Sequence, residues 1–274
     1  MNLKWSRIAI NSVMIILSII MMIPLIWVIL MSFKSTQEII LTSAFALPKT
    51  FGFQNYVEAW VKGMIGEYFF NSVYVTSVTT LFVIVLGTLL AYALSRLRWK
   101  SKNIFFTIIL LGLMIPIHAR VIPVFIIIKN MGLLNSSLCL ILPYIASGLP
   151  MAVYIFRNFM IGIPKEMEEA AFIDGCSVFR SFASVILPTI RPAIITVVIL
   201  TFMQFWNEFV LASTVVQRKS LNTLPIGLQN FQSEFSVDWG AMSAGIVVSV
   251  IPVLIAYTIF NDLIEKSVVS GALK

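Results

Sequence analysis

The chain has 274 residues, of which 59% are hydrophobic and only 11% are charged, and its mean hydropathy is +0.97. A soluble domain normally carries about twice this share of charge, so the composition excludes an ordinary soluble protein and predicts an all-α membrane protein. The net charge of +7 is explained by Lys and Arg beside anionic lipid headgroups, without a nucleic-acid partner.

Six stretches approach or exceed the roughly 20 apolar residues that a membrane-spanning helix needs. They are Ile8–Phe33, Asn71–Leu97, Ile104–Ile128, Leu138–Phe156, Ile194–Ala212 and Ala241–Leu263. The loops on the same side as the two termini hold 12 of the 19 Lys and Arg residues. Because cytoplasmic loops are enriched in these residues, we expect both termini in the cytoplasm and one transmembrane domain over residues 1–274.

The first span could be mistaken for a cleavable signal peptide, because basic residues precede it and Ala44-Phe45-Ala46 follows it. The apolar run is too long for a signal peptide and the small residues lie too far beyond it, so we expect a true span. The extracytoplasmic loop, about residues 35–69, is expected to hold a turn and a short amphipathic helix between Leu47 and Trp60. Its aromatic residues suit the membrane interface.

Prolines interrupt the third and fourth spans. Pro116 and Pro123 are expected to kink or end the third helix, and Pro143 and Pro150 to bend the fourth. Broken helices in membranes often line a transport pathway, but proline kinks are also common without any function. Both interpretations stay open at this point.

A polar segment separates the fourth and fifth spans, in a cytoplasmic loop of about residues 158–192. Glu166, Glu168 and Glu169 suit the first turns of a helix, and Gly175 can adopt the left-handed conformation that ends one. Ala170 and Ala171 belong to a narrow face with Met167 and Asp174, and a second short helix, Val178–Val185, leads to Leu187-Pro188. One interpretation is a helix lying on the bilayer. Such helices are usually rich in Lys and Arg, so three glutamates favour docking to arginines of a soluble partner.

The fifth span contains polar residues. Thr201, Gln204 and Glu208 recur at helical spacing, with Asn207 beside them, and we expect one polar stripe. The stripe would either line a solute path or bond to neighbouring helices, which is common in membranes. The sequence leaves both alternatives open and slightly favours the second.

Catalytic chemistry is not expected in this chain. It has no G-x-x-x-x-G-K-[ST] phosphate loop, so any ATP site must lie on another protein. His118 is the single histidine, which excludes a histidine metal cluster, and no metal or cofactor site is predicted. Cys139 and Cys176 are expected on opposite sides of the membrane and cannot pair.

The polar segment resembles a known family. Glu169-Ala170-Ala171, Gly175 and Leu187-Pro188 match the pattern EAA, three residues, G, nine residues, I, one residue, LP, except that Val185 replaces isoleucine. This is the signature of permease subunits of bacterial binding-protein-dependent ABC importers. The six-span layout, Phe205–Phe209 and the tail Ser270–Lys274 are similar to the sugar branch, which includes the second permease of the maltose importer.

The resemblance implies a type I ABC importer permease, multi-pass in the bacterial cytoplasmic membrane. It implies a second related permease, two ATPase subunits that hold ATP and Mg, an extracytoplasmic solute-binding protein, and a carbohydrate substrate moved by alternating access. The signature residues would form the coupling helix on the ATPase. By resemblance, Glu169 makes a polar contact there, Ala170 and Ala171 permit close approach, and Gly175 supplies the bend. The alternatives are an importer of a non-sugar solute, an ion-driven secondary transporter and a membrane enzyme.

Overall fold

The computed structural model of the chain describes residues 2–43, 45–232 and 237–272; Ala44 of the candidate cleavage motif and residues 273–274 of the tail lie outside these ranges. Within the described ranges the protein is built from helices, with one isolated bridge between Gln232 and Val237. Four helices are long and apolar enough to cross a membrane, and two bent helix pairs raise this number to as many as six. The predicted all-α membrane fold is confirmed.

The chain divides into two compact units, the first formed by Met1–Glu67 and Gly227–Pro252. It contains α1 (Asn2–Met31), α2 (Thr36–Leu41), α3 (Gln54–Val57), the π-helical turn η1 (Glu58–Lys62) and the start of α14 (Trp239–Ala272). The predicted short helix between Leu47 and Trp60 is confirmed as α3 with η1. Asn55 anchors it after α1, because its Nδ2 donates to the Ser32 and Lys34 carbonyl oxygens, both at 2.8 Å.

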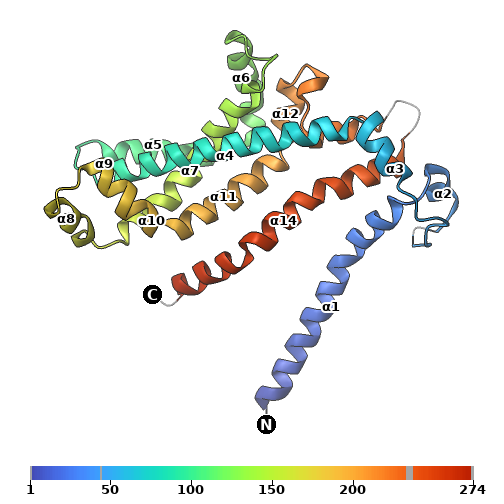
Figure 1. Cartoon of the computed structure of the whole chain (residues 1–274), viewed down its shortest axis with the longest axis horizontal. Helices are drawn as coiled ribbons and strands as arrows, with labels where there is room; N and C mark the ends of the chain where they lie inside the picture. Colours follow the sequence, from blue (N-terminus) through green and yellow to red (C-terminus); the bar gives the residue numbers. More distant parts are fainter. Residues whose placement is uncertain (1, 44, 233–236, 273–274) are drawn as a thin grey trace. The chain divides into compact units, whose positions relative to one another are not determined.

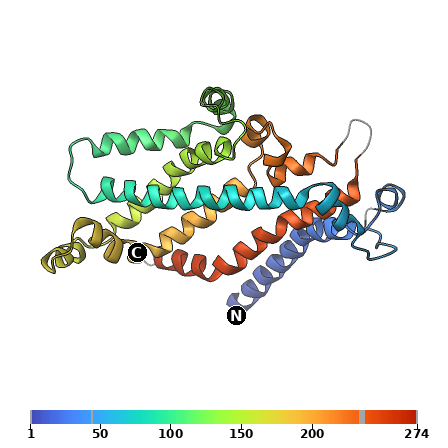
Figure 2. The ribbon, with the colours of Figure 1, turned by 45° about the horizontal axis from the view of Figure 1, so that its top comes forward.

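The second unit, Tyr68–Ile226 and Val253–Lys274, holds the later part of α14 and the remaining helices, except for the first residues of α4 and the last residues of α13. They are α4 (Ile65–Ser95), α5 (Lys102–Met114), α6 (Ile117–Asn130), α7 (Leu138–Ile161), α8 (Glu166–Ile173), α9 (Val178–Ser181), η2 (Phe182–Ile186), α10 (Leu187–Thr189), α11 (Arg191–Trp206), α12 (Val210–Val215), η3 (Lys219–Leu221) and α13 (Leu224–Gln229). In Figures 1 and 2, α4, α5, α7 and α11 lie side by side.

One buried core joins these helices near α8. It takes Tyr92 from α4, Phe156 from α7, Ile186 from η2 and Val197 from α11, all at most 6% exposed. A second core near α12 gathers side chains of α4, α6, α7, α11 and α12 around Tyr144. Close-packed cores of this kind have few low-energy rearrangements, so the elements that share one are held in fixed positions within the unit.

The third predicted span is not one continuous helix. Helix α5 ends at Met114, and α6 begins after Pro116, which lies in an extended conformation at its N-terminal cap. The two axes differ by 106°. The expected break at Pro116 is confirmed, because proline disfavours a helical conformation of the residue before it. Pro123 lies inside α6, and Pro143 and Pro150 lie inside α7, without ending either helix.

The fifth predicted span is also corrected. Helix α11 begins at Arg191 and ends at Trp206, so Asn207 and Glu208 follow the helix rather than lie within it. A new short helix, α12, starts at Val210. At its other end α11 meets the run of α9, η2 and α10 at an angle of 74°. This bend lies between the run that follows α8 and the apolar helix α11.

Candidate functional site

Helix α8 forms where the polar segment was predicted. Its first turn contains Glu166, Glu168 and Glu169, where the free backbone N–H groups and the helix dipole favour acidic side chains. The helix is followed by Gly175 with φ of +81°, so the left-handed conformation expected of this glycine is confirmed.

The end of α8 is a complete Schellman motif. The Gly175 N–H donates to the Phe172 carbonyl at 3.0 Å, and the Cys176 N–H donates to the Ala171 carbonyl at 2.9 Å. The chain then reverses into α9, whose first turn is capped by the Ser177 hydroxyl through the Arg180 N–H. Both ends of the turn are therefore satisfied by local hydrogen bonds.

The Leu187-Pro188 pair lies at the end of a helical run that includes a π turn. The Leu187 N–H bonds to the Phe182 carbonyl, five residues earlier. Pro188 has no N–H to donate, and the Thr189 hydroxyl donates to the Val185 carbonyl at 2.6 Å. Val185, the one departure from the family pattern, is half-buried, and the run from Val178 to Thr189 forms with valine there.

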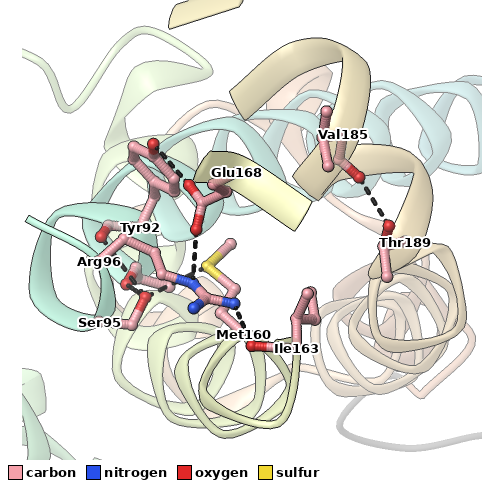
Figure 3. A network of polar contacts seen from close by, with 9 residues as sticks. Tyr92, Ser95, Arg96, Met160, Ile163, Glu168, Val185 and Thr189 are labelled. Atoms are coloured by element: carbon pink, nitrogen blue, oxygen red, sulfur yellow. Dashed lines mark hydrogen bonds and ion pairs between the residues drawn. The ribbon is translucent and has the colours of Figure 1, made fainter. Parts of the chain in front are cut away.

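Glu168 points into the protein (Figure 3). Its Oε2 lies 3.0 Å from Arg96 Nε, and its Oε1 accepts a hydrogen bond of 2.9 Å from the Tyr92 hydroxyl. The Arg96 and Glu168 side chains are 6% and 8% exposed. The Arg96 Nη2 also donates to the Ile163 carbonyl at 2.7 Å. One of the three predicted surface glutamates is therefore satisfied within the chain.

The outward face of α8 differs from the predicted narrow face. Met167, Glu169, Ala170 and Asp174 are exposed as expected, but Ala171 is buried beside Glu168. Ala171 therefore faces its own chain rather than the solvent, at 9% exposure. Large apolar side chains that the sequence analysis did not single out are prominent instead: Ile173 is 86% exposed and Phe179, on α9, is 72% exposed.

The predicted polar stripe of the fifth span does not form one face. Thr201 and Glu208 are buried, whereas Gln204 and Asn207 are exposed. The Asn207 Nδ2 donates to the Met203 carbonyl at 2.9 Å and so closes the last turn of α11. Because α11 ends at Trp206, its helical spacing does not extend to Asn207 and Glu208.

Glu208 holds the start of α12. Its carboxylate accepts the Leu211 N–H at 2.8 Å, the Ala212 N–H at 3.0 Å and the Tyr144 hydroxyl of α7 at 2.6 Å. Backbone N–H groups at a helix start otherwise lack partners, and charge-assisted bonds to them are short and strong. These contacts match the bonding role that the sequence analysis slightly favoured for this residue.

A cavity of about 260 Å³ lies between α6, α7 and α11. Its polar lining consists of Arg120, Ser147, Gln204 and Glu208, and Phe205 and Tyr144 are among its apolar walls. Arg120 comes from the first turn of α6, directly after the break at Pro116. The break in the third span thus places Arg120 in the same cavity as Gln204 and Glu208, two residues of the predicted solute path. The sequence alone did not indicate that these residues lie together.

The comparisons with known proteins agree with this architecture. Residues 83–270 match the family model described as the binding-protein-dependent transport system inner membrane component. The chain belongs to this family. It is similar to the diacetylchitobiose uptake system permease protein NgcG of Streptomyces coelicolor, with 37% identity over 96% of this chain and 88% of that protein.

Other relatives extend the likeness over nearly the whole chain. The trehalose transport system permease protein SugB of Mycobacterium tuberculosis is 33% identical, with 92% of each chain covered. Among solved structures, a chain of a bacterial ABC transporter involved in the import of the polysaccharide alginate superposes with a TM-score of 0.82, at 22% identity and covering 96% of this chain and 98% of that one. The protein has the fold of a type I ABC importer permease.

Proposed function

We propose that this chain is one permease of an ATP-driven importer that moves a di- or oligosaccharide across the bacterial cytoplasmic membrane. Membership of the binding-protein-dependent family supports the transport role. The relatives named for diacetylchitobiose and trehalose support a carbohydrate substrate. In this proposal both termini are cytoplasmic, residues 1–274 form one transmembrane domain, and the chain catalyses no reaction itself.

The proposed partners are a second related permease, two ATP-binding subunits and an extracytoplasmic solute-binding protein. ATP and Mg would be held by the ATP-binding subunits, whose closure would move the coupling segments together and open the cavity outward. ATP hydrolysis would then close the transport cavity on the outside and open it toward the cytoplasm. The segment from α8 to α10 is the proposed coupling segment, and it includes Glu169, Ala170, Asp174, Gly175, Leu187 and Pro188.

The observation that carries the docking proposal is the outward face of α8 and α9. Two large apolar side chains, Ile173 and Phe179, are exposed there beside the acidic Glu169 and Asp174. Apolar anchors surrounded by charged residues are typical of protein interfaces. Ala171 was expected to allow close approach of the ATPase. Because it is buried, we propose that it allows α8 to lie close to its own chain instead.

The solute path is proposed to include Gln204 and Asn207, whose exposed amides can exchange hydrogen bonds with sugar hydroxyls. Glu208 lines the same cavity as Gln204, but its carboxylate already accepts three bonds. We therefore assign Glu208 to the support of this cavity and the two amides to contact with the solute.

The test is to tag the chain, extract it gently from its native membrane and identify the proteins that accompany it. The proposal expects a second permease and an ATPase with a phosphate loop; the chain alone, or only copies of it, would contradict it. Uptake assays with labelled disaccharides and amino acids, using the co-encoded binding protein, would then decide the solute class.

The variant Glu169→Lys sharpens the test. Replacing a carboxylate by an ammonium opposite a basic partner places like charges together, so the ATPase yield is expected to fall about tenfold or more. Glu166→Lys is the matched control, because Glu166 is exposed on the same first turn. Equal ATPase yields from the two variants would argue against a specific contact of Glu169.

A further inference from the structure

Helix α8 has few attachments of its own. It is eight residues long, and of its side chains Glu168 and Ala171 are the buried ones. The connections to α7 and α9, residues 162–165 and 174–177, are short turns. An isolated helix of this length is unstable in water, so the contacts of its buried side chains must fix its direction within the second unit.

The Glu168 side chain contacts the C-terminal end of α4 and the residue that follows it. Tyr92 lies in the last turn of α4 and Arg96 directly follows that helix, where its N–H still bonds to the Tyr92 carbonyl at 2.9 Å. Both side chains contact the Glu168 carboxylate, at 2.9 Å and 3.0 Å. Two contacts one helical turn apart restrict the rotation of α8 as well as its distance from α4. Because the ion pair is nearly inaccessible to water, its attraction is screened little.

Arg96 also holds the connection that precedes α8. While Nε faces Glu168, Nη2 donates to the carbonyl of Ile163, in the turn between α7 and α8. The rigid planar guanidinium can serve two acceptors in different directions, which a lysine ammonium on a flexible stem does less well. One side chain thus connects α4, the end of α7 and α8 (Figure 3).

Tyr92 links these polar contacts to the apolar core. Its ring belongs to the core that includes Phe156 and Ile186, and it packs on Phe182 of η2 with ring centroids 4.9 Å apart. A force applied to α8 through Glu168 therefore reaches α4, α7 and the start of the run into α11 at once.

We propose that Tyr92, Arg96 and Glu168 form a positioning clamp that makes α8 move as one body with the core of the second unit. Without the clamp, the short turns at residues 162–165 and 174–177 would absorb a displacement of α8. With it, the displacement passes to the spans. The inference rests on the proposed function, because it presumes an ATPase that moves α8.

The experiment uses the full complex obtained with the tagged chain, reconstituted in lipid. Cys139 and Cys176 are replaced by alanine, and a spin label is attached at Leu200→Cys, an exposed position on α11. The probe is Mg-ATP with vanadate, and the response is the change in the label's spectrum. ATP hydrolysis and ATPase content are measured on the same samples.

We expect Glu168→Gln to reduce the label's response about 3-fold or more, while the ATPase subunit stays bound and still hydrolyses ATP. Arg96→Lys, which keeps the charge but not the two-directional fork, should give an intermediate response. Glu166→Gln is the matched control on the same helix turn, and its response should equal that of the unmodified chain.

Two results would overturn the clamp. The first is an unchanged response in Glu168→Gln with the complex intact. The second is loss of the ATPase from both Glu168→Gln and Arg96→Lys, because the cluster would then support docking rather than transmit movement. If the unmodified chain carries no ATPase, the proposed function fails, and the clamp fails with it. If the unmodified chain carries the ATPase and one of the two results above is found, the clamp alone fails.

Discussion

Two buried glutamates of the second unit satisfy their charge in different ways. Glu168 in α8 and Glu208 before α12 are 6% and 8% exposed, and each accepts a bond from a tyrosine hydroxyl of another helix. Glu168 is balanced by the side chain of Arg96, which lies far from it in sequence. The charge of Glu208 is balanced by the backbone N–H groups of Leu211 and Ala212, three and four residues later in the chain.

The two glutamates therefore have different roles. Two of the three Glu208 contacts build a local helix start, which is expected to be lost with them. The Glu168 contacts join segments that are separate in sequence and transmit force between them. In both regions the acid serves the fold, and the exposed neighbours, Glu169 and Ile173 in one case and Gln204 and Asn207 in the other, are the residues available to partners or solute.

The largest expected effect is at the local site. Glu208→Ala would leave the Leu211 and Ala212 N–H groups and the Tyr144 hydroxyl without their acceptor. Bonds to charged groups contribute about 1.5–3 kcal/mol each and are not additive, so we expect a loss of about 3 kcal/mol, read as a lower unfolding midpoint in detergent. Glu169→Ala, an exposed acid, is the control, and equal midpoints for the two variants would refute the local role.

A smaller effect is expected at the turn after α8. Gly175 has φ of +81°, where a side chain costs about 1–2 kcal/mol, so Gly175→Ala should lower the amount of ATPase that co-purifies. Gly162→Ala is the matched control, because Gly162 caps α7 with φ of −73°, a conformation open to alanine. If both variants lose the same amount of ATPase, the left-handed turn is not what matters for docking.

The smallest effect is expected from an exposed amide. Gln204→Ala should change the KM for uptake of the identified solute about 3-fold, the size of one ordinary hydrogen bond, with unchanged ATPase content. Thr201→Ala, at a buried position three residues earlier on α11, should leave the KM unchanged. A changed KM in the threonine variant alone would move the solute path away from the exposed side of α11.

The sequence predicted the helices better than their breaks. Apolar length located the spans, and Pro116 and Gly175 marked two places where the backbone conformation is constrained by residue type. The end of α11 at Trp206 carries no proline or glycine, so it could not be predicted from local propensity. At this point the Asn207 amide bonds to the Met203 carbonyl, and Glu208 accepts a bond from Tyr144 on α7, a contact between residues far apart in the chain.

The candidate site shows the same limit. The spacing of the signature residues predicted a short helix and its turn, but not which way the helix faces. Helical periodicity predicted one exposed face of small residues. In the structure Glu168 faces Arg96, and Ala171, three residues later on the same helix, is buried with it. In the sequence, Arg96 is one of several basic residues that follow the second span. The only indication that it pairs with Glu168 was that both residues are expected on the same side of the membrane.

The most direct test of the coupling segment compares two neighbouring positions of different exposure. A photo-crosslinking amino acid is placed at Ile173, which is 86% exposed, or at Ala171, which is 9% exposed, in cells that express the whole system. The account predicts that Ile173 captures an ATPase with a phosphate loop and that Ala171 captures none. Capture only of lipid at Ile173, or equal capture of the ATPase at both positions, would contradict the outward face of α8 as the docking surface.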